Sequence, residues 1–195
     1  MDERIIEKYL PIAKINEANI REKTLVRTRF RTAPLVPRIS NLHWWAARRP
    51  ASGARILTLA SILPSSVSTN VLTSASSLDM LDKSPDGTLY ALSPRLDVIN
   101  EVLKEKVGKE TTDFVVVDPM AGGGSIPLES LRLGFRTIAI EYNPVAYLIL
   151  KATIEFPAKY ADAGLFEETL KVAKEFIARA REELGRYYGA DAENY

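Results

Sequence analysis

Residues 113–144 read DFVVVDPMAGGGSIPLESLRLGFRTIAIEYNP, and this stretch decides the fold that we expect for the chain. The apolar, β-branched run 114–117 is typical of a strand that is covered on both faces, and it stops at the acidic residue Asp118. Three glycines follow, and then a serine that can cap a helix. A second apolar run, 137–140, ends at Glu141. This order predicts a mononucleotide-binding β-α-β unit.

The residues around the glycines favour one class of ligand. A P-loop needs Gly-Lys-Ser/Thr, and no lysine stands between Asp118 and Arg132, so we do not expect a nucleoside triphosphate. Asp118 would also repel the pyrophosphate of a dinucleotide. S-adenosylmethionine carries an ammonium, a sulfonium and a ribose, and Glu141 stands about 20 residues beyond the glycines, where an acid grips ribose hydroxyls. The charge pattern therefore favours S-adenosylmethionine.

Several segments also carry a resemblance to a known family. Residues 118–129 (DPMAGGGSIPLE) and 140–147 (IEYNPVAY) resemble the cofactor-binding motifs of S-adenosylmethionine-dependent amino-methyltransferases that act on DNA. Three further segments resemble the N-terminal domain of unknown function in a predicted adenine-specific DNA methylase family that is common in archaea: LPI at 10–12, REK at 21–23 and LHWWAARRP at 42–50. The two sets of motifs together are more specific than either alone.

The resemblance implies a fold and a cofactor site. The expected fold is α/β: a mainly helical, basic extension over residues 1–92, and a partial Rossmann-like methyltransferase fold over residues 93–195. In this reading the turn begins at Asp118 and the glycines pass beneath the methionine portion of the cofactor. The residues expected to bind S-adenosylmethionine are Asp118, Pro119, Met120, Ala121, Gly122, Gly123, Gly124, Glu141, Tyr142 and Asn143, with either Tyr142 or Asn143 near the adenine.

Basic residues cluster in the N-terminal part. Lys plus Arg (26) nearly balance Asp plus Glu (25) in the whole chain, but nine basic residues stand between Arg21 and Arg55 against the single acid Glu22. We expect this region to face DNA. The side chains that can stack on a base or hold phosphates are His43, Trp44, Trp45, Arg48 and Arg49. The alternative is structural, because tryptophans at helical spacing are more often core residues and arginines often pair with acids.

The composition excludes several classes of protein. The chain has no cysteine and one histidine, so we expect neither disulfides nor a metal site. Its N-terminal residues lack the apolar core of a signal peptide, and no run is long enough to span a bilayer. We therefore expect a cytoplasmic protein without a membrane segment.

Outside the β-α-β unit the patterns predict mostly helices. Residues 42–64 favour two helical pieces joined near Pro50, and apolar residues at steps of three and four favour an amphipathic helix over 166–184. Partial alternation over 24–30 allows an exposed strand. The segment 65–77 is rich in Ser, Thr and Asn, which predicts a long loop.

One catalytic motif is missing. Amino-methyltransferases that resemble this chain share Asp/Asn/Ser-Pro-Pro-Tyr/Phe, which accepts hydrogen bonds from the target amine and orients it for in-line attack on the methyl group. The sequence has no such Pro-Pro motif; in similar family members it would lie beyond the equivalent of Tyr195. We therefore expect the S-adenosylmethionine-binding part of a DNA (adenine-N6) methyltransferase, with the motif on a companion polypeptide that also completes the sheet.

Three other interpretations stay open. The chain could be a non-catalytic binding or assembly subunit, or a degenerate copy of the enzyme. It could also act on RNA or on a small molecule, because a cofactor unit does not identify the acceptor. Finally, the three glycines could serve only the close packing of a strand against a helix.

Overall fold

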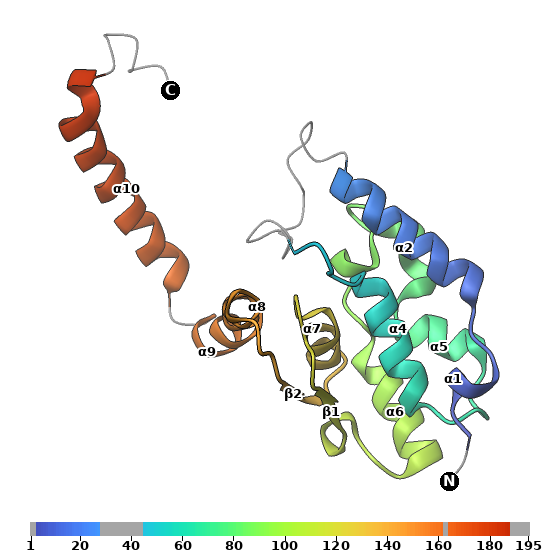
Figure 1. Cartoon of the computed structure of the whole chain (residues 1–195). Coiled ribbons are helices and arrows are strands. Elements are labelled where there is room, and N and C mark those ends of the chain that lie inside the picture. The colour runs from blue at the N-terminus through green and yellow to red at the C-terminus, as the bar shows by residue number, and fades with distance from the viewer. Residues whose placement is uncertain (1–2, 28–44, 162–163, 188–195) are drawn as a thin grey trace. The chain divides into compact units, whose positions relative to one another are not determined.

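The structure is a computed structural model that describes residues 3–27, 45–161 and 164–187 (Figure 1). Contacts divide the chain into two compact units, Met1–Ile154 and Glu155–Tyr195. The boundary predicted between residues 92 and 93 falls inside the first of them. The first unit therefore contains both the helical N-terminal part and the predicted β-α-β unit.

Short helices form most of the first unit. Those before the first strand are α1 (Ile5–Lys8), α2 (Ile12–Arg27), α4 (Ala51–Ile62), α5 (Thr69–Ala75) and α6 (Leu96–Val107), with the 3₁₀ segments η1 (Leu78–Lys83), η2 (Leu89–Ala91) and η3 (Thr111–Asp113). Helix α4 contacts α1, α2 and α5, and it lies among the other helices in Figure 1. It is therefore the central helix of this part.

The hydrophobic core is built around α4. The sequence from its first turn onward is largely apolar, and Ile56, Leu59 and Leu63 are fully buried. Burying one such side chain contributes roughly 1.5–3 kcal/mol to the free energy of unfolding. The same apolar cluster includes Leu133 and Phe135, which lie between helix α7 (Ser125–Arg132) and the second strand. The N-terminal helices and the β-α-β unit thus share one core.

The predicted β-α-β unit is present. Strand β1 (Val115–Asp118) leads through helix α7 (Ser125–Arg132) to strand β2 (Arg136–Ala139), and the strands are parallel, with Val117 opposite Ile138. The β-branched runs form the strands and Gly134, at a φ of +84°, follows the helix. The local pattern of the sequence was therefore sufficient to predict this unit.

The predicted α/β fold class with a partial Rossmann-like sheet is wrong. Most of the described residues are helical, and these two strands form the whole of their sheet structure. The error has a physical reason. The cofactor motifs need only one β-α-β unit, whereas the other long apolar runs have helical length and pack as α4 and α8 (Pro144–Leu150).

Two smaller predictions also differ from the structure. The segment 65–77, predicted as a loop, contains α5, which begins where the Ser68 hydroxyl accepts a hydrogen bond from the Val71 N–H (3.4 Å). The strand predicted over 24–30 is contradicted as far as Arg27, because α2 continues to that residue. The rest of that segment lies outside the described residues. A serine-rich stretch was mistaken for a loop because serine is common in both loops and helix caps.

One face of the small sheet carries exposed aliphatic side chains. Phe114 and Val116 pack against the core on the other face. On the exposed face, four aliphatic side chains are each between 45% and 54% exposed to solvent: those of Val115, Val117, Ile138 and Ile140. We call these four residues the aliphatic sheet face. They are unusual because large aliphatic side chains are normally covered in a parallel sheet.

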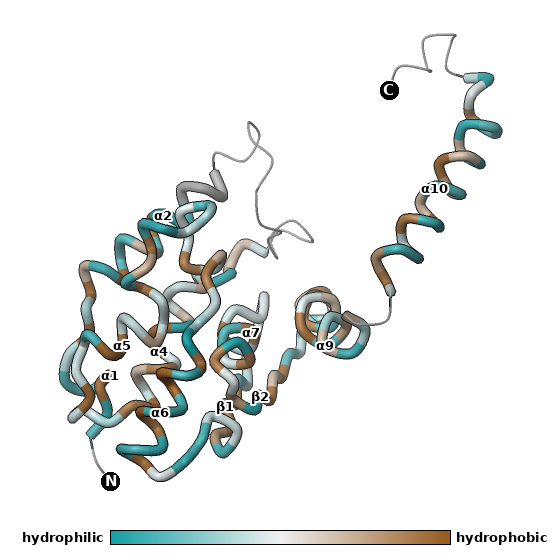
Figure 2. Tube along the Cα trace, turned by 180° about the vertical axis from the view of Figure 1, so that it is seen from behind, coloured by the Kyte–Doolittle hydropathy of each residue, from teal (hydrophilic) through white to brown (hydrophobic). Residues whose placement is uncertain are grey.

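The remaining helices include a long amphipathic one. After α8 come the π-helical turn Lys151–Glu155, α9 (Phe156–Tyr160), α10 (Leu165–Leu184) and the 3₁₀ segment η5 (Gly185–Tyr187). Figure 2 shows hydrophobic and hydrophilic residues alternating along α10, so the amphipathic helix predicted over 166–184 is confirmed. Within the described part of the chain, each helix is too short or too polar to cross a bilayer.

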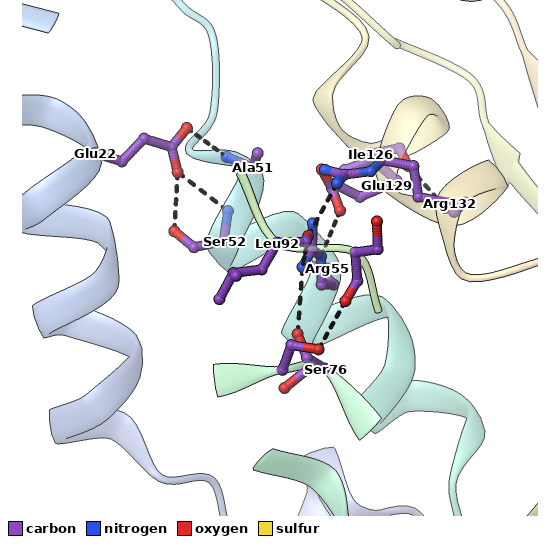
Figure 3. A network of polar contacts seen from close by, with 12 residues as sticks. Glu22, Ala51, Ser52, Arg55, Ser76, Leu92, Ile126, Glu129 and Arg132 are labelled. Carbon is purple, nitrogen blue, oxygen red and sulfur yellow. Dashed lines mark hydrogen bonds and ion pairs between the residues drawn. The ribbon is translucent and has the colours of Figure 1, made fainter. Parts of the chain in front are cut away.

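A buried ion pair joins α4 to α7 (Figure 3). The Arg55 Nε donates to the Glu129 Oε2 at 2.6 Å, and both side chains are completely buried. The Arg55 Nη1 donates to the carbonyls of Ser76 (3.3 Å) and Leu92 (2.8 Å), and the Arg132 Nη1 donates to the Glu129 Oε1 at 2.7 Å. Burial lowers the pKa of Arg55, and the Glu129 charge opposes that effect. The carboxylate is thus shared by two guanidinium groups.

We expect Glu129→Gln to lower the free energy of unfolding by about 3–5 kcal/mol, because it leaves the buried charge of Arg55 without its partner. Urea unfolding of the purified chain measures this. Replacing both residues by methionine should restore most of the loss. The matched control is Glu3→Gln in the exposed pair with Lys8, which should cost less than about 1 kcal/mol. Equal costs for the two glutamate variants would contradict the expectation.

Candidate functional site

The glycine turn is anchored to the ends of both strands. The Ile140 N–H donates to the Asp118 carbonyl (2.9 Å) and the Ala121 N–H donates to the Ile140 carbonyl (3.0 Å). The Asp118 carboxylate accepts from the Met120 N–H at 3.2 Å, and the Gly124 N–H donates to the Ala121 carbonyl at 2.9 Å. The turn therefore has one defined conformation at the carboxyl ends of β1 and β2.

Two of the glycines have backbone conformations that disfavour other residues. Gly122 has a φ of +52° and Gly124 a φ of +80°. A Cβ on Gly124 would lie 2.7 Å from the Cδ2 of Leu150 in α8. The turn thus needs glycine both for its conformation and for close packing against α8.

Glu141 links the glycine turn to the start of α8. Its Oε1 accepts from the Asn143 N–H at 2.8 Å and its Oε2 accepts from the Gly122 N–H at 2.5 Å. The hydrogen bond from the Asn143 N–H has the largest effect on the pKa of Glu141 and lowers it, and the hydrogen bond from the Gly122 N–H lowers it further. A carboxylate has about four acceptor positions, so each oxygen can accept a further hydrogen bond. The acid and the glycines that the sequence places far apart are therefore in direct contact.

The other predicted cofactor residues divide into exposed and buried groups. Met120 is 86% exposed, and Pro119, Tyr142 and Asn143 are also exposed. Ala121, Gly123 and Gly124 are buried. The exposed side chains lie where the strands end, so a ligand at this edge would contact them before it reached the backbone of the turn.

Two residues of the predicted nucleic-acid block lie against the glycine turn. The Arg48 Nη1 donates to the Gly123 carbonyl at 2.8 Å, and a Cβ on Gly123 would lie 3.0 Å from the Cδ1 of Trp45. The Ser125 hydroxyl donates to the Arg49 carbonyl at 2.6 Å. Two motif blocks that are about 75 residues apart in sequence therefore form one site. No local sequence pattern could have revealed this contact.

The described part of that block is a turn and not the predicted helix. Residues 45–49 are not helical: the Arg48 N–H donates to the Trp45 carbonyl at 3.1 Å, which closes a turn, and the first helical hydrogen bond runs from the Ala54 N–H to the Pro50 carbonyl (3.1 Å). Arg49 is exposed, and Trp45 is half-buried. His43 and Trp44, the two other residues predicted to contact nucleic acid, lie outside the described residues.

The guanidinium of Arg48 is incompletely bonded. Solvent does not reach its Nε and Nη2, and neither atom has a hydrogen-bond partner among the described residues. Burial lowers the pKa of Arg48, while Tyr90 and Glu22 partly offset this effect. Glu22 does not bond to Arg48; its carboxylate accepts from the N–H groups of Ala51 (2.8 Å) and Ser52 (3.2 Å) at the start of α4 (Figure 3). Two nitrogen atoms of the Arg48 guanidinium, beside Gly123, are thus shielded from solvent and have no partner among the described residues.

Other basic residues of the N-terminal cluster have structural partners. Arg55 is buried, and Arg21 pairs with Glu17 (2.5 Å) and Asp82 (2.7 Å). The positive charge that the sequence concentrates between residues 21 and 55 is therefore only partly available for nucleic acid.

We expect Gly124→Ala to lower the free energy of unfolding by about 1 kcal/mol more than Gly108→Ala does. Both residues have positive φ, at +80° and +69°, but a Cβ meets Leu150 at position 124 and no atom within 4 Å at position 108. The difference between the free energies of unfolding of the two variants, measured with urea, reports the steric cost of the Cβ at position 124. Equal losses would show that conformation alone demands glycine there.

The lowered pKa of Glu141 predicts a pH-dependent contribution to stability. Because the folded state favours the ionised carboxylate, the contribution is complete above 4.5, the ordinary value, and is lost as the pH falls through the lower folded pKa. The stability difference between wild type and Glu141→Gln should therefore be large near about pH 7 and small near about pH 3. Glu101→Gln, at an exposed position of α6, is the control. A difference that does not change with pH would contradict the role of these hydrogen bonds.

Comparisons with known proteins relate only the N-terminal part of the chain to a family. Residues 9–83 are similar to a family of proteins of unknown function, DUF1156. The matched segment includes α2, α4 and α5 and ends before the β-α-β unit. No curated protein matches the chain, and no solved structure matches it. The similarity thus includes Trp45 and Arg48 at the glycine turn but assigns no activity.

Proposed function

We propose that this chain is the S-adenosylmethionine-binding part of a DNA (adenine-N6) methyltransferase, and that a companion polypeptide carries the catalytic Pro-Pro motif. The main support is the hydrogen bond from the Gly122 N–H to the Glu141 carboxylate, which connects the acid after the second strand to the glycine turn after the first. The resemblance of residues 118–129 and 140–147 to amino-methyltransferase motifs supports the same assignment. The choice of adenine as the target rests on that resemblance alone.

The side chains at the site fit the parts of S-adenosylmethionine. Glu141 retains acceptor positions for the ribose hydroxyls, and the fully exposed ring of Tyr142 can pack on the adenine. Asp118 places negative charge at the turn, where the cofactor has cationic groups. When bound, the cofactor supplies an electrophilic methyl group. This chain's own residues would bind and orient it.

The companion polypeptide is supported by the aliphatic sheet face. Two parallel strands are not stable without cover on their faces and edges, and the four aliphatic residues of this face are about half exposed. A polypeptide that adds strands to β1 or β2 would cover them and could bring the Pro-Pro motif to the same edge. A DNA methyltransferase acts on the chromosome, so the proposal keeps the cytoplasmic location that the sequence suggests.

DNA would be held by the N-terminal basic residues that remain available. Arg49 is exposed, and an arginine can bond to a phosphate through two parallel N–H groups. Arg21 and Arg55 are already paired within the chain. We therefore assign the phosphate contact to Arg49 among the described residues of the predicted block.

A second candidate is a non-catalytic assembly subunit or degenerate copy. It is favoured by the packing of Trp45, Arg48 and Leu150 against the glycines, because these side chains occupy space that a glycine turn can otherwise offer to a ligand. In that case the β-α-β unit would serve only to dock the companion polypeptide. Binding of the cofactor separates the two candidates.

We expect the purified chain to bind S-adenosylmethionine in a calorimetric titration, and Glu141→Ala to bind it at least about tenfold more weakly, since two charge-assisted hydrogen bonds to the ribose are lost. Asp118→Ala should also weaken binding. Glu101→Ala, at an exposed site of α6, should leave the affinity unchanged. A folded wild-type chain that does not bind the cofactor would favour the assembly subunit.

A further inference from the structure

The geometry points to Arg48 as a carboxylate-binding residue: its Nε and Nη2 hold the α-carboxylate of S-adenosylmethionine above Gly123. This role rests on the proposed function and deepens it, because it gives the N-terminal part of the chain a direct share in the cofactor site. It also reassigns Arg48, which the sequence had suggested as a contact to nucleic acid.

The orientation of the guanidinium supports this role. The hydrogen bond from the Arg48 Nη1 to the Gly123 carbonyl (2.8 Å) fixes the plane of the group. In a guanidinium, the Nε–H and one N–H of Nη2 point in the same direction and form a fork. These are the two nitrogen atoms of Arg48 that have no hydrogen-bond partner in the part of the chain that the structure describes. The distance between the two oxygen atoms of a carboxylate matches such a fork, so the two groups can form parallel hydrogen bonds.

The charge of Arg48 also lacks a partner among the described residues. A shielded guanidinium is costly unless an anion or several acceptors bond to it. In the same chain, Arg55 is bonded to the Glu129 carboxylate at 2.6 Å and leaves only its Nη2 unpaired. Arg48 forms no ion pair with any described residue, and both oxygens of Glu22 bond to the start of α4. A ligand carboxylate would supply the acceptor that Arg48 lacks.

The location of Arg48 suits an amino-acid ligand attached to a nucleoside. Arg48 bonds to Gly123, and Glu141 bonds to the adjacent residue, Gly122. One site thus presents a cation for a carboxylate and an anion for ribose hydroxyls, with Asp118 at the start of the same turn. Because solvent does not reach the fork, the side chains that cover it must move when the ligand binds.

A DNA phosphate fits Arg48 less well. Phosphates of a duplex approach the protein surface, whereas the Nε and Nη2 of Arg48 are shielded from solvent. The neighbouring Arg49 is exposed and binds the turn only through its backbone carbonyl. The two adjacent arginines therefore have different roles, Arg48 toward the cofactor and Arg49 toward solvent.

Calorimetric titration with S-adenosylmethionine and with its decarboxylated analogue tests this role, because the two compounds differ only in the carboxylate. Wild type should bind the complete compound about ten to a hundred times more tightly. Arg48→Met should remove this preference and leave the affinity for the decarboxylated compound unchanged, which also shows that the variant is folded. Arg48→Lys should keep part of the preference, since it retains the charge without the fork. Arg179→Met, at an exposed position of α10, is the matched control and should behave as wild type.

The possible failures are distinguishable. If wild type binds both compounds equally, or if Arg48→Met keeps the preference, the role of Arg48 is wrong while the cofactor site remains. If Arg48→Met instead weakens only the binding of duplex DNA, the fork holds a phosphate. If a folded wild-type chain binds neither compound, the proposed function is wrong, and the role of Arg48 with it.

Discussion

The buried ion pair between Arg55 and Glu129 joins the N-terminal helices to the β-α-β unit, beside the apolar core that both parts share. Each residue is the fifth of its helix, Arg55 in α4 and Glu129 in α7, so the pair brings the amino ends of both helices together. The Trp45–Arg48 turn immediately precedes α4, and the glycine turn immediately precedes α7. The contact between Arg48 and Gly123 therefore lies close in sequence to this charge pair, seven residues before Arg55 and six before Glu129. Removing that pair would affect the candidate site as well as the stability.

The sequence predicted the parts of the fold that local interactions decide. β-branched residues favour β1 and β2, and glycines with positive φ favour the turns around α7. The Rossmann-like sheet was predicted from motifs that belong to one β-α-β unit, so its error lay in extending a local signal to a whole fold. The role of Ser68 as a helix cap was missed because the surrounding composition resembles a loop.

Only the part of the candidate site that lies within the β-α-β unit could be predicted from the sequence. Asp118, the glycines and Glu141 lie within one unit, and the short spacing between them indicates their proximity. Arg48 comes from a segment about 75 residues earlier, and only the tertiary structure places it at Gly123. The sequence also cannot separate arginines at the surface from buried ones such as Arg55. Charge counts in the region 21–55 therefore overstated the basic surface.

The aliphatic sheet face has a consequence for the life of the chain in the cell. An uncovered, half-exposed patch beside open strand edges is the kind of surface that chaperones and proteases recognise and that promotes aggregation. A newly made chain would be vulnerable for as long as this patch stays uncovered. Synthesis at the same time and place as a binding partner would shorten that period. Under the proposed function, covering this patch would be a task of the companion polypeptide, and the chain would be better protected where that polypeptide is present.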